Sequence, residues 1–480
     1  MMAEEIITDK TISPVFQGGI NPGGWVDFRA YEIKQELARG EQKPFKEVVR
    51  YFGDPHAFGQ KPITSLRQFL SCVICPTLLE DSDYPKDIHE KVNRILNAKA
   101  GHVISSYTDP LGLRIVREDV AQFISERDGY PADPEDIILT NGGAHGIQVG
   151  MQALDASSDS RNKRTGILIP IPVFPHYLSR IMEYNFHQIP YYLDEDHDWC
   201  LDIGELKRAL DKARPYCTPR ALVLINPGNP TSQVLTYDNI REVIKFCARE
   251  KLVLFADEVY QETVFTDEVQ FHSCRKVLRD LGPEYNKFQL MSINSVSKGF
   301  YGECGVRGAY MELVGFSKEV KVQFRDVLSP NVSPTTIGQA AVSAMCNPPR
   351  TGDESYETFI KEKTAILESY RRKAKITTSM LNSLEGISCS DVTGALYAFA
   401  KIELPQKAIE EAKLKNCTPD EFYTWQLLEA TGLLPIPGSN FGQKEGTYHV
   451  RFTILPSEDK VVSMFNRIST FHKEFMDKYR

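Results

Sequence analysis

The sequence has no apolar stretch near the ~20 residues that a membrane-spanning helix needs. It has no cluster of positive charge; its formal net charge is -8 and its isoelectric point is about 5.8. Nucleic acid and anionic membranes are therefore not expected as partners. Internal repeats and low-complexity linkers are missing too. What remains is 480 residues of ordinary globular composition, 42% hydrophobic and 25% charged, which is enough for two structural lobes.

Disulfide and metal sites have little support in the sequence. The 10 cysteines are scattered and do not form the framework of a small secreted domain. Cys72 and Cys75 form one C-x-x-C, but no second such pair completes a zinc site. Leu, Val and Ile flank the pair, which favours an apolar helix that uses cysteine as a small hydrophobe. The histidines show no metal-ligand spacing, so no metal is expected.

Two further patterns are missing. The first ten residues, MMAEEIITDK, lack the basic and apolar regions of a signal peptide and the arginine-rich character of a mitochondrial presequence. We therefore expect a cytoplasmic protein. The turn NGGAHG (141–146) is not the G-x-G-x-x-G of a dinucleotide site, which makes a nicotinamide-dependent dehydrogenase a remote alternative.

The middle of the chain alternates apolar strands with helical patterns. Continuous apolar runs predict buried parallel strands at 136–140, 165–172, 186–193, 221–226, 251–260, 288–294 and 308–315. Helical patterns lie between them, at 144–154, 238–250 and 271–282. This alternation predicts an α/β fold with a doubly wound, mostly parallel sheet.

The two flanks differ from this middle region. We expect an N-terminal arm and part of a small domain in 1–105, a large domain in 106–355, and the C-terminal part of an α+β small domain in 356–480. The charge-rich helix at 354–375 is most simply a solvated face.

Polar residues and glycines follow several of the predicted strands, at the edge where ligands of doubly wound sheets bind. The glycines of NGGAHG allow close approach to a helix start, which suits an anion, although a plain tight turn is the alternative. An aspartate after a strand is most often a helix cap. Lys298 lies among small residues and could be a solvated charge, a phosphate clamp or a covalent anchor. The residues in question are Gly142, Gly143, Asn226, Asn229, Asp257, Tyr260, Ser295, Ser297, Lys298 and Arg307.

In this order, the motifs resemble the fold-type I pyridoxal-phosphate aminotransferases of class I/II, and are most similar to the alanine aminotransferase family. The resemblance extends from about Tyr31 to the C-terminus. The strings that carry it are IVREDVAQFISERDGYPADP (115–134), LIPIPVFPHY (168–177), INPGNPT (225–231), ADEVYQ (256–261), SVSKGFYGECGVRGAY (295–310) and PGSNFGQKEGTYHVRFTILP (437–456).

The resemblance implies an aminotransferase that transfers an amino group between an alanine-like amino acid and a 2-oxo acid such as 2-oxoglutarate. It also implies pyridoxal 5'-phosphate as cofactor, with Lys298 as covalent anchor and acid–base catalyst. Asp257 is expected to pair with the ring nitrogen and Arg451 with the substrate carboxylate. The remaining cofactor contacts are expected from Gly143, Ala144, Phe174, Asn229, Tyr260, Ser295 and Arg307, with Asn229 also near the substrate.

A homodimer is implied as well, because Tyr107 matches a tyrosine that reaches the phosphate in the neighbouring subunit. A core position for Phe174 and a loop anchor for Tyr107 are the simpler alternatives. For Arg451 the simpler alternative is an exposed strand charge.

The chain departs from the family pattern at Ala144, where a hydroxyl residue is usual, and at Phe174, where tyrosine is usual. The segment 17–27, which overlaps GGINPGGWVDFRA (18–30), lacks a V-R-G run, and the segment 329–339 also differs. A lyase that breaks a C–S bond by β-elimination is therefore the alternative activity, since the same cofactor serves several bond cleavages. A regulatory protein with this fold would need a DNA-binding domain, and the first 30 residues are too few and not basic.

Overall fold

The computed structural model describes residues 8, 10–12, 24–81, 83–154 and 163–480. Its largest sheet has seven strands in the order β2-β8-β7-β6-β5-β3-β4. Neighbouring strands are parallel except at β8, which is antiparallel to both β2 and β7. The predicted doubly wound, mostly parallel α/β sheet is thus confirmed. The prediction that 308–315 is a parallel strand is wrong, because an apolar run indicates burial on both faces and not the direction of the strand. The strands are β2 (Ile137–Asn141), β3 (Arg164–Ile171), β4 (His187–Tyr192), β5 (Cys217–Ile225), β6 (Val253–Asp257), β7 (Leu290–Ser295) and β8 (Gly308–Val314).

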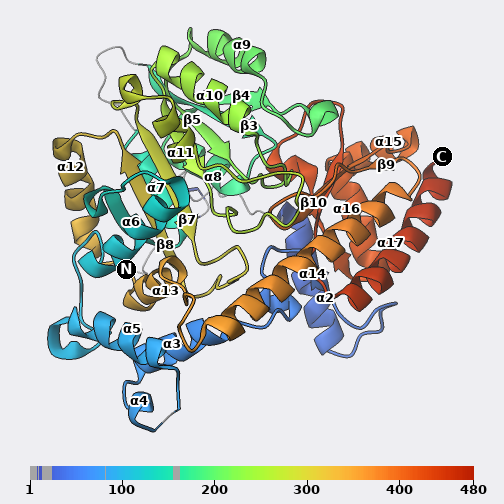
Figure 1. The fold of residues 1–480 in the computed structure, drawn as a ribbon. Coiled ribbons are helices and arrows are strands. Elements are labelled where there is room, and N and C mark those ends of the chain that lie inside the picture. The colour runs from blue at the N-terminus through green and yellow to red at the C-terminus, as the bar shows by residue number, and fades with distance from the viewer. Residues whose placement is uncertain (1–7, 9, 13–23, 82, 155–162) are drawn as a thin grey trace, which may run out of the picture.

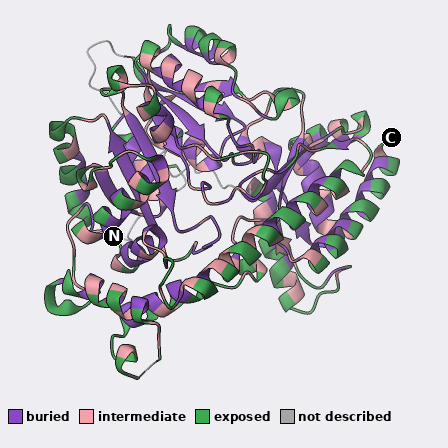
Figure 2. Cartoon of the chain, viewed as in Figure 1, coloured by how far each residue is buried: buried purple, intermediate pink, exposed green. Residues whose placement is uncertain are grey.

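Helices cover both faces of this sheet (Figure 1). Along β5, Leu222 and Leu224 pack against α9, α10 and α11, whereas Ala221, Val223 and Ile225 pack on the side of α7, α8 and α12. Burial on both faces explains the continuous apolar runs, and the strands form the buried interior in Figure 2. These helices are α7 (Gly143–Gln152), α8 (Pro175–Glu183), α9 (Ile203–Ala213), α10 (Tyr237–Glu250), α11 (Cys274–Asp280) and α12 (Lys318–Leu328).

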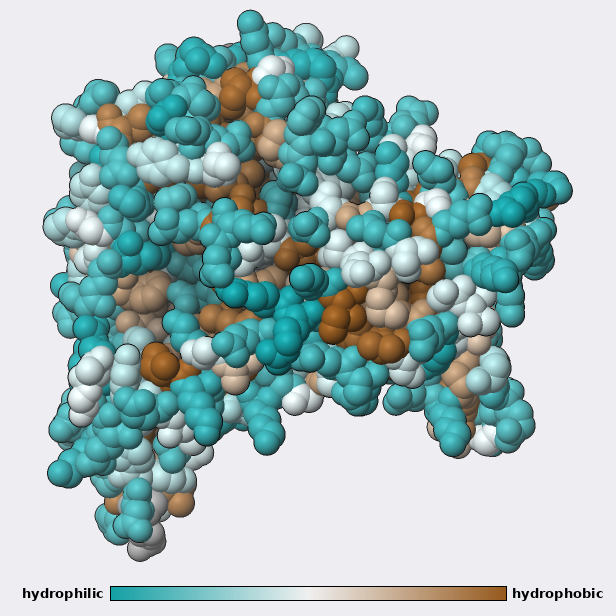
Figure 3. Space-filling view, turned by 45° about the vertical axis from the view of Figure 1, so that its right-hand side comes forward, coloured by the Kyte–Doolittle hydropathy of each residue, from teal (hydrophilic) through white to brown (hydrophobic). Residues whose placement is uncertain are grey.

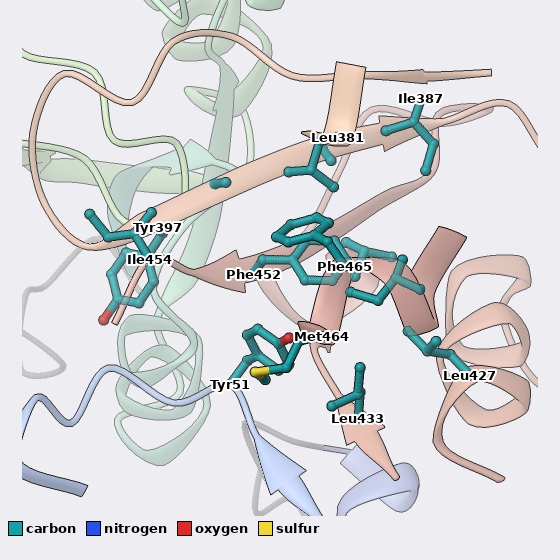
Figure 4. Close-up of a cluster of buried hydrophobic side chains, with 14 of the residues drawn as sticks. Tyr51, Leu381, Ile387, Tyr397, Leu427, Leu433, Phe452, Ile454, Met464 and Phe465 are labelled. Carbon is teal, nitrogen blue, oxygen red and sulfur yellow. The ribbon is translucent and has the colours of Figure 1, made fainter. Parts of the chain in front are cut away.

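A second sheet, in the order β12-β13-β10-β9, lies in the C-terminal part of the chain. It packs with four helices around a core that includes Tyr397, Phe452 and Phe465 (Figure 4). Its strands are β9 (Ile387–Ser388), β10 (Tyr397–Ile402), β12 (Ile436–Pro437) and β13 (His449–Thr453). Its helices are α14 (Tyr356–Asn382), α15 (Gln406–Leu414), α16 (Pro419–Thr431) and α17 (Glu458–Tyr479).

The N-terminal part of the chain joins this second unit. Apolar residues of α2 (Gly24–Ala38) share a core with Leu428 of α16. The short strand β1 (Val49–Arg50) pairs in parallel with β11 (Leu433–Leu434). A unit built from both chain ends therefore stands beside the large sheet, and α14 runs between the two (Figure 1).

Other early helices pack on the large-sheet side. α3 (Thr64–Ile74) and α5 (Lys86–Asn97) share a core with α6 (Arg114–Asp128) and α13 (Thr336–Cys346), and α4 (Leu78–Asp81) lies between them in sequence. Cys72 is buried in α3, as expected of a small hydrophobe, and Cys75 is exposed directly after the helix. The division of the chain at 105 and 355 stays a prediction.

The molecular surface is mostly polar, as the ordinary globular composition of the sequence predicts. The face in Figure 3 is mostly hydrophilic, and apolar side chains reach it in separate patches. Among the described residues, every helix is too short or too polar to cross a bilayer.

Candidate active site

The predicted site residues gather at the carboxyl edge of the large sheet. The neighbouring parallel strands β5, β6 and β7 end at Ile225, Asp257 and Ser295, and Ile225 lies opposite Asp257 in register. Asn226 follows β5 directly, and its amide donates to the carbonyl oxygen of Asp257 at 3.0 Å. The parallel register thus brings these segments of the sequence together at one end of the sheet, as expected for a doubly wound fold.

Asp257 is a buried carboxylate with one side unsatisfied. The Tyr177 hydroxyl donates to Oδ2 at 3.0 Å, while Oδ1 is buried without a hydrogen-bond partner among the described residues. Burial raises the pKa of Asp257 to about 6, against the opposing effect of the Tyr177 hydroxyl. A buried acceptor of this kind calls for a cationic or protonated partner, because an unpaired buried charge is costly.

Arg307 lies against the turn that precedes α7. Gly142 has a φ of +83°, and a Cβ there would lie 2.0 Å from Nη2 of Arg307, so only glycine fits. Nη1 of Arg307 donates to the carbonyl oxygen of Cys304 at 2.7 Å and to Oγ of Ser297 at 3.4 Å. The guanidinium and the first amides of α7 together suit an anion such as a phosphate group.

Lys298 contacts the N-terminal part of the chain. Its Nζ donates to the carbonyl oxygen of Gly53, and Sγ of Cys304 lies 3.7 Å from the same oxygen. A Cβ at Gly53 would lie 2.0 Å from the hydroxyl oxygen of Tyr397. Residue 53 must therefore be glycine for its backbone and Tyr397 to approach the lysine together.

Four side chains connect the two sheets beside this lysine. The hydroxyl oxygens of Tyr260 and Tyr397 are 2.8 Å apart, and Cζ of Arg451 lies 4.1 Å from the centre of the Tyr397 ring. Nη1 of Arg451 donates to Oδ1 of Asn229 at 2.9 Å. Figure 4 shows Tyr397 at one end of the C-terminal core, with its hydroxyl directed away from the apolar cluster.

Burial sets the electrostatics of this group. It raises the pKa of Tyr260 well above the usual value, and the adjacent Tyr397 hydroxyl adds to the rise. It lowers the pKa of Arg451, whose guanidinium lies over the rings of Tyr397 and Phe441 and whose Nε is buried without a hydrogen-bond partner in the described chain. An arginine with a spare donor in this setting suits a planar carboxylate.

The other predicted site residues lie around these clusters. Phe174 is half-buried and immediately precedes α8, and Nε2 of His176 lies 3.1 Å from the carbonyl oxygen of Ala144. Ser295 is buried at the end of β7, and Tyr107 is 78% exposed before α6. Residues 17–23 of the divergent segment lie outside the described residues, while 24–27 begin α2. The roles assigned to all of these residues stay predictions.

Sequence reasoning missed Gly53, Tyr177 and Tyr397. Tyr177 stands three residues after Phe174 in LIPIPVFPHY, so the motif contained it without indicating its bond to Asp257. Tyr397 is one of two aromatic residues in the segment GALYAFAKIEL, and nothing in that segment indicates its contact with Tyr260. Their partners lie far away in the sequence, so local patterns carry no signal for these contacts.

Comparison with known proteins now gives the family. The family model described as "Aminotransferase class I and II" matches residues 76–468. "Alanine aminotransferase 2-like" of Danio rerio is 46% identical over 454 residues, which cover 94% of this chain and 82% of the relative. "Alanine aminotransferase 1" of Homo sapiens is 44% identical over 454 residues, covering 94% and 91%. The chain belongs to the class I and II aminotransferase family.

Solved structures share the fold. An aminotransferase from Escherichia coli superposes with a TM-score of 0.73 at 21% identity, covering 97% of this chain and 98% of that one. The alanine aminotransferase from Pyrococcus furiosus gives a TM-score of 0.73 at 22% identity, covering 96% and 99%. The predicted family and fold class are confirmed, and so is the prediction that the enzyme is a transaminase.

Proposed function

We propose that this enzyme transfers the amino group of alanine to a 2-oxo acid such as 2-oxoglutarate, with pyridoxal 5'-phosphate as cofactor and Lys298 as its covalent anchor. The relatives named alanine aminotransferase, 44–46% identical over 94–95% of the chain, support the substrate. The buried, half-satisfied carboxylate of Asp257 is the observation that carries the cofactor assignment. It stands at a strand end where a protonated ring nitrogen would satisfy Oδ1.

The residues present fit the cofactor at both of its ends. Asp257 would keep the proton on the ring nitrogen, and Arg307 with the amides that begin α7 would hold the phosphate. Ser295 would add a hydroxyl at the phosphate, whereas Ala144 offers only its backbone. Phe174 would lie against the ring face, and Tyr260 and Asn229 near its phenolic oxygen. The bound cofactor supplies a ring that stabilises negative charge on the substrate α carbon.

This chain's own side chains would bind the substrate and move its proton. Arg451 grips the α-carboxylate with a second donor beside the one that it gives to Asn229. This contact would orient the α C–H bond toward Lys298, whose Nζ would take the α proton as general base and hold it for return as general acid. The ring of Tyr397 keeps the Arg451 guanidinium in place. The hydroxyl of Tyr397 keeps the Tyr260 hydroxyl in place through the hydrogen bond between them.

The test is a single-turnover reaction of the cofactor-loaded enzyme with a panel of amino acids and no 2-oxo acid acceptor. A transaminase releases one equivalent of 2-oxo acid per active site and then stops until an acceptor is added. Alanine should react with the highest apparent second-order rate constant, and Lys298→Ala should show neither product nor the visible absorbance of a lysine-bound cofactor. Continuous release of ammonia with the 2-oxo acid would instead identify the β-eliminating lyase.

We also infer a homodimer in which Tyr107 reaches the phosphate of the neighbouring site. The exposure of this aromatic residue, 78%, on the segment before α6 supports such a role. In this arrangement Tyr107→Phe weakens cofactor binding in the dimer. Sedimentation of the protein as a monomer would contradict the proposed dimer. Unchanged cofactor affinity in Tyr107→Phe would contradict the proposed role of Tyr107. The cytoplasmic location stays a prediction.

A further inference from the structure

A cavity lies beside the proposed catalytic site. Its volume is about 350 Å³, within the range of ~300–1,000 Å³ that is typical of small-molecule sites. It lies between the segment 58–62, helix α14 and the residues that follow β13. None of its lining residues belongs to the site proposed for catalysis, and they include Phe58, Pro62, Ile366, Tyr370, Lys373 and Leu455.

Lys373 is the unusual member of this lining. Its side chain is on the charge-rich helix that the sequence indicated as a solvated face, yet the residue is only 6% exposed, so that interpretation is wrong here. Nζ donates to the carbonyl oxygen of Leu455 at 3.1 Å, and in the described chain no carboxylate lies within ion-pair distance of it. Burial lowers the pKa of Lys373 to about 8.

An ammonium group carries three N–H bonds, and Leu455 accepts one of them. Nζ also lies 5.1 Å from the centre of the Tyr370 ring, and its remaining donors lie at a cavity whose walls combine apolar side chains with several polar ones. The neighbouring charges are occupied elsewhere or open to water: Glu362 accepts from the amide and hydroxyl of Thr64, Glu458 pairs with Arg372, and Lys61 is exposed. An anionic group is therefore the missing partner, and an apolar chain fits the rest of the lining.

We propose that this cavity is a second ligand site, which takes a small monocarboxylate with an apolar chain or ring and binds its carboxylate through Nζ of Lys373. The site is connected to the catalytic loop. Tyr370, one turn before Lys373, donates its hydroxyl to Oε1 of Gln60, and Nε2 of Gln60 donates to the carbonyl oxygen of Phe300 at 2.8 Å. Phe300 is two residues beyond Lys298, so a ligand that moves Tyr370 acts on the loop that carries the lysine.

The experiment is a 19F NMR titration of the cofactor-loaded enzyme with 4-fluorophenylacetate. Because Arg451 also binds carboxylates, the titration uses Arg451→Gln as background, which isolates the second site. Saturable binding is expected there. Adding Lys373→Met should weaken it at least tenfold, while Lys373→Arg should retain it. Lys363→Met is the matched control, since Lys363 is on the same helix, over the Phe300 ring, and outside the lining.

Two measurements on the background variant need no change at Lys373. The neutral amide 4-fluorophenylacetamide has the same shape and should bind at least tenfold more weakly than the acid. Affinity for the acid should fall as the pH rises through about 8, because the ligand binds the ammonium form. The proposal is overturned by the lack of saturable binding, by equal binding of acid and amide, or by equal binding with and without Lys373→Met.

Discussion

At the scale of the residue, the site combines groups that are poorly satisfied without a ligand. Oδ1 of Asp257 and Nε of Arg451 are buried without hydrogen-bond partners in the described chain, although each side chain is anchored at another atom. Tyr177 and Asn229 serve as those anchors, so the two charged groups are held in place before any ligand binds. Such preorganisation costs stability and saves reorganisation during catalysis.

The cost of this preorganisation in folding stability can be measured at Asp257. Its pKa of about 6 in the folded state lies above the usual 3.8, so the folded protein binds the proton more tightly than the unfolded chain. Unfolding free energy from this group is therefore greatest below pH 4 and is lost as the pH rises through about 6, by up to ~3 kcal/mol. Asp257→Asn removes the charge and leaves the shape.

In the cofactor-free form, Asp257→Asn should be nearly as stable as the unchanged protein at pH 4. At pH 7.5 it should be more stable, by up to ~3 kcal/mol. The transaminase activity of the cofactor-loaded variant should fall by roughly 100-fold or more. Urea unfolding at the two pH values checks the difference. An equal stability difference at both values would show that the carboxylate is not held at a raised pKa.

At the scale of the element, the start of α7 is shaped by one glycine. Gly142 follows β2 with a positive φ, and its missing Cβ leaves room for the Arg307 guanidinium. Arg307 itself has a φ of +64°, which is uncommon outside glycine and places its side chain back over the helix start. The turn before α7 and the loop after Lys298 therefore form the proposed phosphate site together, and neither forms it alone.

Gly142→Ala should weaken cofactor binding at least tenfold. The new Cβ would lie 2.0 Å from Nη2 of Arg307, and alanine is strained at the φ of +83°. Equilibrium dialysis against pyridoxal 5'-phosphate measures the effect. Gly305→Ala is the control, because it lies in the same catalytic loop and a Cβ there meets no atom within 4 Å. Equal affinities for the two variants would contradict the proposed phosphate site.

At the scale of the whole molecule, a buried histidine joins the two sheets. His449 of β13 lies with Nε2 3.0 Å from Oε1 of Glu195, in the connection that follows β4, and Nδ1 3.0 Å from Oε1 of Gln443. Its ring is stacked on Phe399 at 4.7 Å. Since His449 is two residues before Arg451 in the same strand, this contact helps to set where Arg451, the proposed carboxylate-binding residue, lies relative to the large sheet.

Glu195→Ala should lower the unfolding free energy by about 1–3 kcal/mol, because Nε2 of the buried His449 ring loses its acceptor. It should also raise the KM for the amino acid more than it lowers kcat, since Arg451 loses part of its support. Thermal unfolding and steady-state kinetics check both effects. Asp196→Ala is the matched control, an exposed acidic residue in the same turn. Equal unfolding free energies and equal KM values for Glu195→Ala and Asp196→Ala would show that His449 does not join the two units.

Four of the site residues predicted from the sequence share one property. Asp257 and Ser295 end strands, and Gly143 and Lys298 come two or three residues after strands, whose apolar runs are visible locally. The fold then places these strand ends at one edge of the sheet. The interpretation of α14 as a solvated face failed at Lys373 because charge composition alone does not show which residues of a helix meet another segment. Burial of a charged residue depends on the packing around it.

By itself, the sequence determined the strands, the helices between them and the motifs of the family, because each of these is written in contiguous residues. Only the tertiary structure decided that Tyr397 reaches Tyr260, 137 residues away, and that the carbonyl oxygen of Gly53 reaches Lys298, 245 residues away. The same holds for the cavity of Lys373, whose walls come from three separate segments. The physical reason is that such contacts form only when both ends of the chain fold into one unit beside the large sheet. Local periodicity predicts single helices and strands, and it does not predict which distant segments pack together.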